Sequence, residues 1–267
     1  MYITYHGTAA AEGAPGIFCE CDFCRYAKAA GGKEIRTRPG SMIDGVLKLD
    51  FGPDSFAQML SFGEDYTKLE HILITHSHED HLAEMNLSMV RPGFSKTTRV
   101  LTVYGNEKVG ERLKKYLRKD KLHFVQLELY KTYDIAGYSV TPMEAVHALG
   151  SGEVPFIYLI EKDGKRLLYG HDTDIFPDSV MEFMKGKRCD LISLDCTDGV
   201  KVVNYKGHMG IADNLLMREK LISIGAADEN TVFVANHFSH NALVPYEQLE
   251  KLLPGFAVAY DGMTLMV

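Results

Sequence analysis

A cluster of three histidines and two carboxylates in residues 76–81 constrains this chain more than any other part of its sequence. The cluster directly follows the apolar, β-branched run Ile72–Ile74, which predicts a buried strand. From residue 80 onward apolar side chains recur at helical spacing, so the cluster is predicted to form the turn between a strand and a helix. Imidazoles and carboxylates are ligands of divalent metals, and a solvated polar loop is the alternative. Two adjacent ligand groups predict two ions: His76 with His78, and Asp80 with His81, the last two opening the helix.

The composition of the 267 residues is that of an ordinary folded protein, with 46% hydrophobic and 24% charged residues. No stretch approaches the roughly 20 apolar residues of a membrane span, so no membrane partner is expected. The net charge of −7 disfavours nucleic acid as a partner without excluding a local basic patch. The first residues lack the basic and apolar regions of a secretion signal, and five cysteines favour reduced thiols. We therefore expect a cytoplasmic protein.

Three of the cysteines form a C-x-C-x-x-C motif at Cys19, Cys21 and Cys24. Three thiolates at this spacing can surround one tetrahedral zinc ion, but they leave its fourth position to a ligand elsewhere in the chain. Three buried thiols or a redox pair are the alternatives. The spacing favours metal binding over both.

Strands and helices alternate along the rest of the chain. Strands are predicted at residues 2–5, 42–49, 72–74, 99–104, 123–129, 138–143, 156–161, 166–169, 191–195, 231–235, 256–260 and 263–267. Helices are predicted at residues 25–30, 55–62, from 80 onward, and at 107–118, 177–185, 211–224 and 245–252. The alternation predicts a layered α/β fold, and the hairpins argue against a purely parallel sheet. Since no long linker interrupts the pattern, we expect one domain over residues 1–267.

Further metal-ligand candidates stand at the ends of predicted strands: His147, Asp172 and His237. Strand ends of a layered α/β protein lie along one edge, where a site can be gathered. An isolated histidine is more often structural, and Asp172 could simply close an Asx turn. Together with residues 76–81, however, the three candidates reinforce one another and predict a single site.

This series of histidines and aspartates resembles, in order and spacing, the ligand series of the metallo-β-lactamase superfamily. Several N-terminal features and the closing Asp261-Gly262-Met263 resemble more narrowly the phosphoribosyl cyclic phosphate phosphodiesterases of the carbon–phosphorus lyase pathway. The N-terminal features are Gly7-Thr8, Gly16, the three-cysteine motif and Arg36-x-Arg38. The resemblance implies an αββα four-layer sandwich with the metals at one edge.

The resemblance also implies the distribution of ligands. One metal would take His76, His78 and His147, and the other Asp80, His81 and His237, with Asp172 bridging. His240 would complete a structural zinc site with Cys19, Cys21 and Cys24, clipping the N-terminal loop to the C-terminal strand end. The histidine and aspartate ligands suit Zn²⁺, Mn²⁺ and Fe²⁺ alike.

The implied reaction is hydrolysis of a small, cyclic ribose phosphodiester by a hydroxide held between two ions. His208 is the candidate that protonates the leaving alkoxide, and a solvent-facing loop residue is the alternative. Asp80 belongs to the catalytic set as well as to the ligands, and Asp50 is placed to orient a ligand imidazole. His171 departs from the pattern, because related sequences commonly carry a small residue there.

Single residues discriminate between the alternatives within the superfamily. Flavin-coupled diiron oxidoreductases carry Glu where this chain has His78, which disfavours redox chemistry. The commonest zinc β-lactamases carry Cys where Asp172 falls, which disfavours antibiotic hydrolysis. The rival hypothesis is a transfer-RNA 3′-processing endoribonuclease, which shares the first histidine motif and a His-Phe-Ser run like 237–239. The cysteine motif and the acidic charge favour the phosphodiesterase. A zinc-binding protein without catalysis is disfavoured by the full ligand set, and a homodimer is compatible with all of these features.

Overall fold

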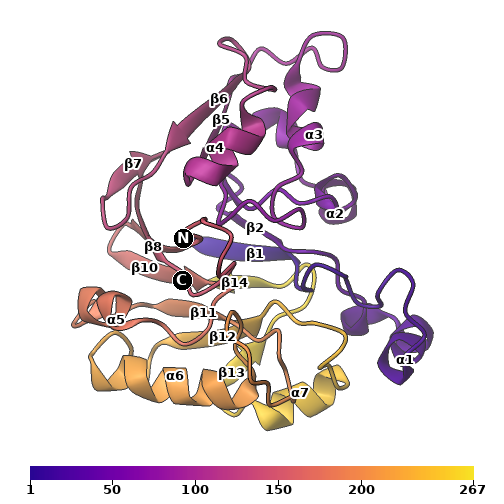
Figure 1. Ribbon diagram of the computed structural model, residues 1–267, viewed down its shortest axis with the longest axis vertical. Coiled ribbons are helices and arrows are strands. Elements are labelled where there is room, and N and C mark those ends of the chain that lie inside the picture. Colours follow the sequence, from indigo (N-terminus) through magenta and orange to yellow (C-terminus); the bar gives the residue numbers. More distant parts are fainter.

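Two seven-stranded β-sheets lie face to face in the computed structural model, which describes all 267 residues (Figure 1). The first sheet has the order β14 (Thr264–Met266), β1 (Tyr2–Gly7), β2 (Gly40–Ile43), β3 (Leu47–Leu49), β4 (His71–Leu73), β5 (Leu101–Gly105) and β6 (Leu122–Gln126). The second has the order β13 (Phe256–Val258), β12 (Val232–Asn236), β11 (Leu191–Asp195), β10 (Lys165–Gly170), β9 (Phe156–Lys162), β8 (Tyr138–Glu144) and β7 (Tyr133–Ile135).

Helices cover the outer face of each sheet, which completes the αββα sandwich (Figure 1). The first sheet carries α2 (Ser55–Phe62), α3 (Glu84–Leu87) and α4 (Glu107–Leu113), whereas the second carries α5 (Asp178–Met184), α6 (Ile211–Ser223) and α7 (Tyr246–Leu252). Helix α1 (Asp22–Ala30) stands to one side on the N-terminal loop, and three short 3₁₀ turns span Gly32–Glu34, Tyr66–Lys68 and Ser88–Val90. The predicted α/β fold is confirmed. None of the helices is long and apolar enough to cross a membrane.

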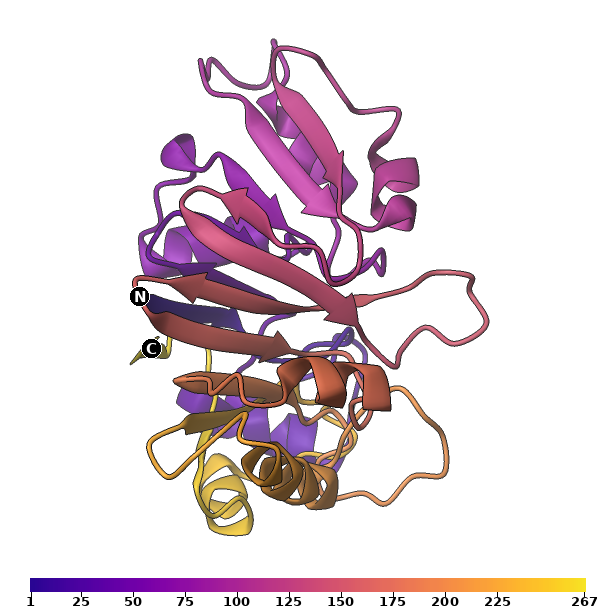
Figure 2. The ribbon, with the colours of Figure 1, turned by 90° about the vertical axis from the view of Figure 1, so that its left-hand side faces the viewer.

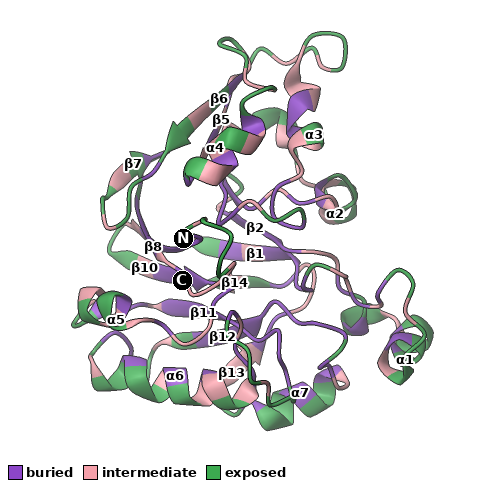
Figure 3. Cartoon of the chain, viewed as in Figure 1, coloured by how far each residue is buried: buried purple, intermediate pink, exposed green.

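The uninterrupted apolar run of β9 shows why the sheets stack in this way. Phe156, Tyr158 and Ile160 point into the core between the sheets, while Ile157 and Leu159 pack against the helices outside. Both faces of the strand are therefore buried, and each large apolar side chain contributes about 1.5–3 kcal/mol of transfer free energy. Figure 3 shows the resulting pattern of buried strands beneath helices whose outer faces are exposed.

At two tight turns the structure differs from the prediction. The predicted strand 42–49 is a hairpin of β2 and β3, because Asp44 and Gly45 adopt positive φ angles of 50° and 67° and reverse the chain. An Asp-Gly pair between apolar residues is a strong hairpin signal. The short strand β7 was not predicted; it joins β8 through Ala136 and Gly137, at φ 55° and 79°, and alanine carries little turn signal.

The register of the parallel strands determines where the site lies. β10, β11, β12 and β13 run parallel, and so do β3, β4, β5 and β6 of the other sheet. The carboxyl ends of parallel strands meet at one edge, and polar residues directly after those ends are brought together. Figure 2 shows the strands of both sheets from the side, with long loops leaving them at this edge.

Candidate metal centre

The turn after β4 is held by pairing with the segment that follows β3. Phe51 exchanges two backbone hydrogen bonds of 2.8 Å with residues 81–83, so this stretch cannot continue a helix. The predicted helix start at residue 80 is therefore wrong. Helix α3 begins at Glu84, and Asp80 and His81 remain in the turn.

A first group of histidines forms where this turn meets the loop after β8. The ligand atoms of His76, His78 and His147 all lie within 4.8 Å of one another. His147 Nε2 is 3.2 Å from His78 Nδ1, and the rings of His76 and His78 are 4.4 Å apart. His76 is fully buried, whereas His78 is exposed, so the group opens toward solvent on one side.

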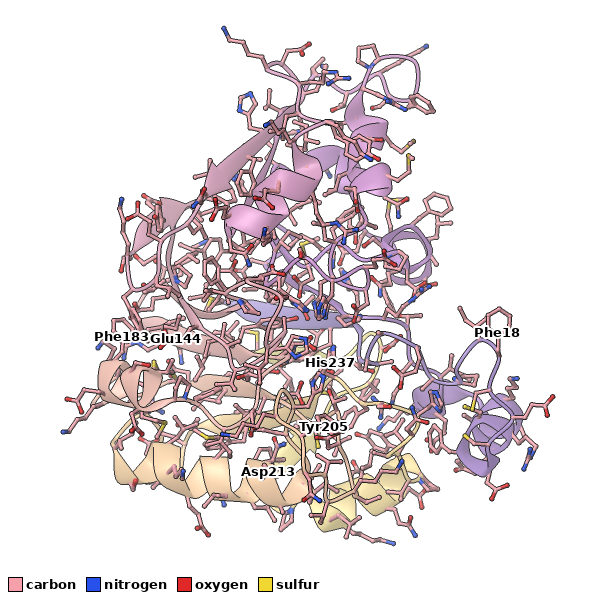
Figure 4. All side chains as sticks on the ribbon, in the orientation of Figure 1. Phe18, Glu144, Phe183, Tyr205, Asp213 and His237 are labelled. Carbon is pink, nitrogen blue, oxygen red and sulfur yellow. The ribbon has the colours of Figure 1, made fainter.

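A second group, formed by Asp80, His81 and His237, lies directly beside the first. Asp172 stands between the groups and turns one carboxylate oxygen toward each. Its Oδ2 is 2.7 Å from His81 Nε2 and 2.9 Å from His237 Nε2, while its Oδ1 is 3.5 Å from His147 Nε2. Figure 4 places His237 near the middle of the molecule.

The short approaches of Asp172 Oδ2 to His81 and His237 are not hydrogen bonds. The Nε2 atoms of His76, His81 and His237 and the Oδ2 atom of Asp172 are all buried, and none has a hydrogen-bond partner. Unpaired buried polar atoms are costly, and four that converge on one place need a shared partner. A divalent cation fits this donor set of imidazole nitrogens and carboxylate oxygens.

In three of the candidate ligand histidines the opposite ring nitrogen is held by the protein. His81 Nδ1 lies 2.8 Å from Asp50 Oδ2, and His237 Nδ1 lies 2.7 Å from Thr197 Oγ1. His147 Nδ1 lies 3.0 Å from the Gly207 carbonyl oxygen. Such contacts fix the ring and its tautomer and leave Nε2 free for a metal.

Electrostatics at the site follow from burial and from the carboxylates. Burial lowers the pKa of His76 well below its usual value. Burial also opposes the charged form of His81, but the Asp80, Asp172 and Asp50 carboxylates outweigh it and raise the pKa of His81 well above its usual value. A cation among these carboxylates would meet the same negative field.

The structure adds one residue that the sequence analysis missed, Asp195 at the end of β11. Its Oδ2 accepts the Asp172 N–H at 3.0 Å and lies 3.1 Å from His208 Nδ1. Its Oδ1 accepts the N–H groups of Thr197 and Met209 at 2.9 and 3.0 Å. Asp195 is fully buried, and together with Asp172, His208 and His237 it forms a further acidic and histidine group. A polar residue ending an apolar strand was the available signal.

His208 lies at the rim of the site, with its ring 4.7 Å from that of His147. Its Nδ1 faces both Asp195 and Asp172, at 3.1 and 3.7 Å. Burial opposes the charged ring, but Asp195 outweighs it and raises the pKa of His208 to about 9. The geometry is that of an imidazole held by a carboxylate and able to carry a proton at the site.

Three residues of the site have strained backbones. Asp50, Asp172 and His237 are non-glycine residues with positive φ angles of 56°, 50° and 63°. Such conformations cost about 1–3 kcal/mol each and persist where the surrounding structure enforces them, commonly at functional sites. His171, which departs from the family pattern, is buried behind Asp172 and lies 2.7 Å from the Ser193 hydroxyl through Nε2.

The cysteine motif and His240 form a separate group, with all four ligand atoms within 4.8 Å of one another. The Gly16 N–H approaches Cys24 Sγ at 3.3 Å, and the Cys24 N–H approaches Cys21 Sγ at 3.4 Å. The hydrogen bond from the Cys24 N–H lowers the pKa of Cys21 to about 6 and so favours the thiolate. A Cβ atom on Gly16 would lie 2.8 Å from His240 Nε2, so a larger residue here would push the His240 ring out of the group.

A match to a known sequence family agrees with this geometry. Residues 47–259 match the family described as beta-lactamase superfamily domain, and the chain therefore belongs to that superfamily. Solved structures show the same fold over the whole chain. A diphosphatase from the PhnP family superposes with a TM-score of 0.79 at 24% identity, covering 100% of this chain and 97% of that one.

Two further structures extend the comparison. Zn²⁺-bound PqqB from Methylobacterium extorquens has a TM-score of 0.77 at 21% identity, covering 100% of this chain and 100% of that one. The short form of human tRNase Z has a TM-score of 0.67 at 16% identity, covering 100% of this chain and 99% of that one. These likenesses establish the metallo-beta-lactamase fold.

A curated relative, an octanoyltransferase of Porphyromonas gingivalis (strain ATCC BAA-308 / W83), is 24% identical over 281 residues. The match covers 98% of this chain but 50% of the relative, so the chain spans about half the length of the curated protein it matches.

Proposed function

We propose that this protein is a metal-dependent phosphodiesterase that hydrolyses a small phosphodiester, such as a cyclic ribose phosphate. The observation that carries the proposal is the position of Asp172, which turns one carboxylate oxygen toward each of two adjacent ligand groups. One ion would be held by His76, His78 and His147, and the other by Asp80, His81 and His237.

Divalent ions at these positions would supply an activated water at neutral pH and a Lewis acid for the phosphate oxygens. The chain's own residues then have three tasks. Asp172 keeps the two groups together, while Asp50 and Thr197 orient the imidazoles of His81 and His237. His208 is the proton donor for the leaving alkoxide, because Asp195 holds its Nδ1 and leaves the other ring nitrogen free.

A small substrate is favoured over transfer RNA by the position of the basic run that follows α4. Lys114, Lys115, Arg118 and Lys119 are exposed, but they precede β6, whereas the metal centre follows the end of β4. Because β4, β5 and β6 are parallel, these two places lie at opposite edges of the sheet. The cations are therefore poorly placed to guide an RNA backbone into the site. The likeness to a PhnP-family diphosphatase supports the same choice.

Acyl transfer, named for the curated relative, is less well supported by the described residues. A covalent acyl-enzyme would need an activated nucleophile at the site. Cys189 and Cys196, the cysteines outside the motif, are fully buried, and burial raises the pKa of Cys189 to about 12. Neither thiol belongs to the groups that could hold a metal ion.

We also propose a structural zinc at Cys19, Cys21, Cys24 and His240. Four converging donors of this kind complete a closed tetrahedral site. The zinc would tie the loop before α1 to the segment after β12, and β1 already pairs with β14. We therefore treat residues 1–267 as one domain.

The test is a screen of the protein reloaded with Zn²⁺, Mn²⁺ or Fe²⁺. The substrates are bis(p-nitrophenyl) phosphate, a ribose cyclic phosphate and a precursor transfer RNA. We expect turnover of the first two. Cleavage of the precursor RNA with no turnover of the cyclic phosphate would replace the proposal with the endoribonuclease. Three bound metals without any turnover would indicate a non-catalytic metal-binding protein.

A further inference from the structure

The residue between two candidate ligands, Ser77, has all of its polar groups bound by charged side chains. Its backbone N–H donates to Glu153 Oε1 at 2.8 Å, and its hydroxyl donates to Glu153 Oε2 at 2.7 Å. Its carbonyl oxygen accepts from Arg112 Nη1 at 2.9 Å. Arg112 is itself paired with Glu84 at 3.0 Å, so α3 and α4 hold the turn from one side and Glu153 holds it from the other.

Glu153 is in turn fixed by the first residue of the α4 region. Asn106 is buried and caps α4 by accepting the Val109 N–H at 3.1 Å. Its Nδ2 donates to Glu153 Oε1 at 2.7 Å and to the Val154 carbonyl at 3.1 Å. Glu153 has no ion-pair partner, so its charge is met by three donors from Ser77 and Asn106. Hydrogen bonds to a carboxylate are roughly twice as strong as neutral ones.

These contacts join the two segments that share the first histidine group. Ser77 lies between His76 and His78, and Glu153 lies in the loop between β8 and β9, which also carries His147 (Figure 2). The Phe156 N–H also donates a backbone hydrogen bond of 2.8 Å to the Thr75 carbonyl oxygen. Apart from that bond and the 3.2 Å approach of the His147 and His78 rings themselves, the Glu153 carboxylate is the group that links the loop to the turn at the level of the ligands.

We propose that Glu153 is a positioning residue, which fixes the distance between His147 and the His76–His78 turn and thereby sets the metal affinity of this group. The inference rests on the proposed function, because it assumes that the group binds an ion. Ligands held in place before the ion arrives lose less conformational freedom on binding, and partners of ligand residues commonly contribute 10–100-fold to metal affinity.

The test is a titration of the full-length chain with Mn²⁺, followed by the electron paramagnetic resonance signal of the free ion. Mn²⁺ prefers oxygen and nitrogen ligands, so the cysteine group does not compete for it. We expect two sites in the wild type, and Glu153→Ala should weaken one of them by about 10–100-fold while the other stays within about twofold. Glu153→Gln keeps one acceptor oxygen, so the Mn²⁺ affinity of its weakened site should lie between those of the wild type and Glu153→Ala.

Glu128→Ala is the matched control. Glu128 and Glu153 line one hollow on the surface, but the Glu128 carboxylate pairs with Lys131 at 3.2 Å, away from the turn. Two unchanged Mn²⁺ sites in Glu153→Ala would overturn the inference. Loss of both sites with a lowered melting temperature in both Glu153 variants would overturn it as well, since that result indicates a role in folding alone. A wild type that binds no Mn²⁺ would refute the proposed function itself.

Discussion

Replacing Asp195 by asparagine tests whether one buried carboxylate organises the metal centre. Its Oδ1 accepts the N–H groups of Thr197 and Met209, and its Oδ2 accepts the Asp172 N–H, the Thr197 hydroxyl and His208. An amide has one acceptor oxygen, so its nitrogen must face either two backbone donors or the Asp172 N–H. The second orientation costs less free energy, because the Thr197 hydroxyl and the His208 imidazole can accept a hydrogen bond instead of donating one.

The magnitude follows from these contacts. One orphaned buried donor costs about 1–3 kcal/mol, and the remaining bonds lose the assistance of the charge, so we expect Asp195→Asn to lower the free energy of unfolding by roughly 2–5 kcal/mol. The same change releases the anchor of Asp172, whose backbone is strained, so Mn²⁺ affinity should fall by about 10–100-fold.

Urea unfolding of the metal-free protein and Mn²⁺ titration measure the two effects. Asp198→Asn is the control: this buried neighbour accepts the Tyr205 hydroxyl through Oδ1 at 2.6 Å, and its Oδ2 has no partner. Burial raises the pKa of Asp198, so a neutral amide should be tolerated there within about 1 kcal/mol. Equal unfolding free energies for the two variants would refute the assigned role of Asp195.

Three other predictions concern separate parts of the chain. His240→Ala should release one zinc per chain and lower the melting temperature while leaving both Mn²⁺ sites intact; lost turnover with all zinc retained would contradict the structural role. His208→Ala should slow hydrolysis of alkyl phosphodiesters by about 10²–10⁴-fold, but much less for p-nitrophenolate, which leaves without a proton; equal losses would rule out the proton donor. Burial lowers the pKa of Lys48 from 10.5 to about 7, so the unfolded chain binds more protons between those values and the wild type should gain stability as pH rises from 7 to 10.5. Lys48→Met should remove that gain and stabilise the protein at pH 7 by about 1–4 kcal/mol in urea unfolding; an unchanged pH dependence would contradict it.

The layered fold could be predicted because burial leaves a direct mark on the sequence. β9 is a continuous apolar run from Phe156 to Ile160, as expected for a strand covered on both faces. The start of α3 could not be predicted, because the apolar spacing after residue 80 resembles a helix and the competing bridge to Phe51 comes from a distant segment. Tertiary hydrogen bonds decided the local conformation.

The residues of the site likewise divide into those that the sequence marks and those that only the folded chain identifies. His76, His147 and His237 stand out as histidines at strand ends, and the structure brings them together. Asp195 stands at an equivalent strand end but belongs to no metal-ligand motif, so the sequence alone does not single it out. Glu153 had no signal at all, because its role depends on its distance from Ser77, which only the folded chain defines.

The register of β9 and β10 has a practical consequence for engineering. The two strands are antiparallel, and their connecting turn at Asp163 and Gly164 is exposed and lies at the start of β10, a full strand length from Asp172. An insertion inside β10 would shift the register by one residue and turn its inward side chains outward. A reporter peptide or fluorescent label placed at residues 163–164 would leave the strand alternation unchanged, and this hairpin tip is therefore the preferred attachment point for observing the protein at work.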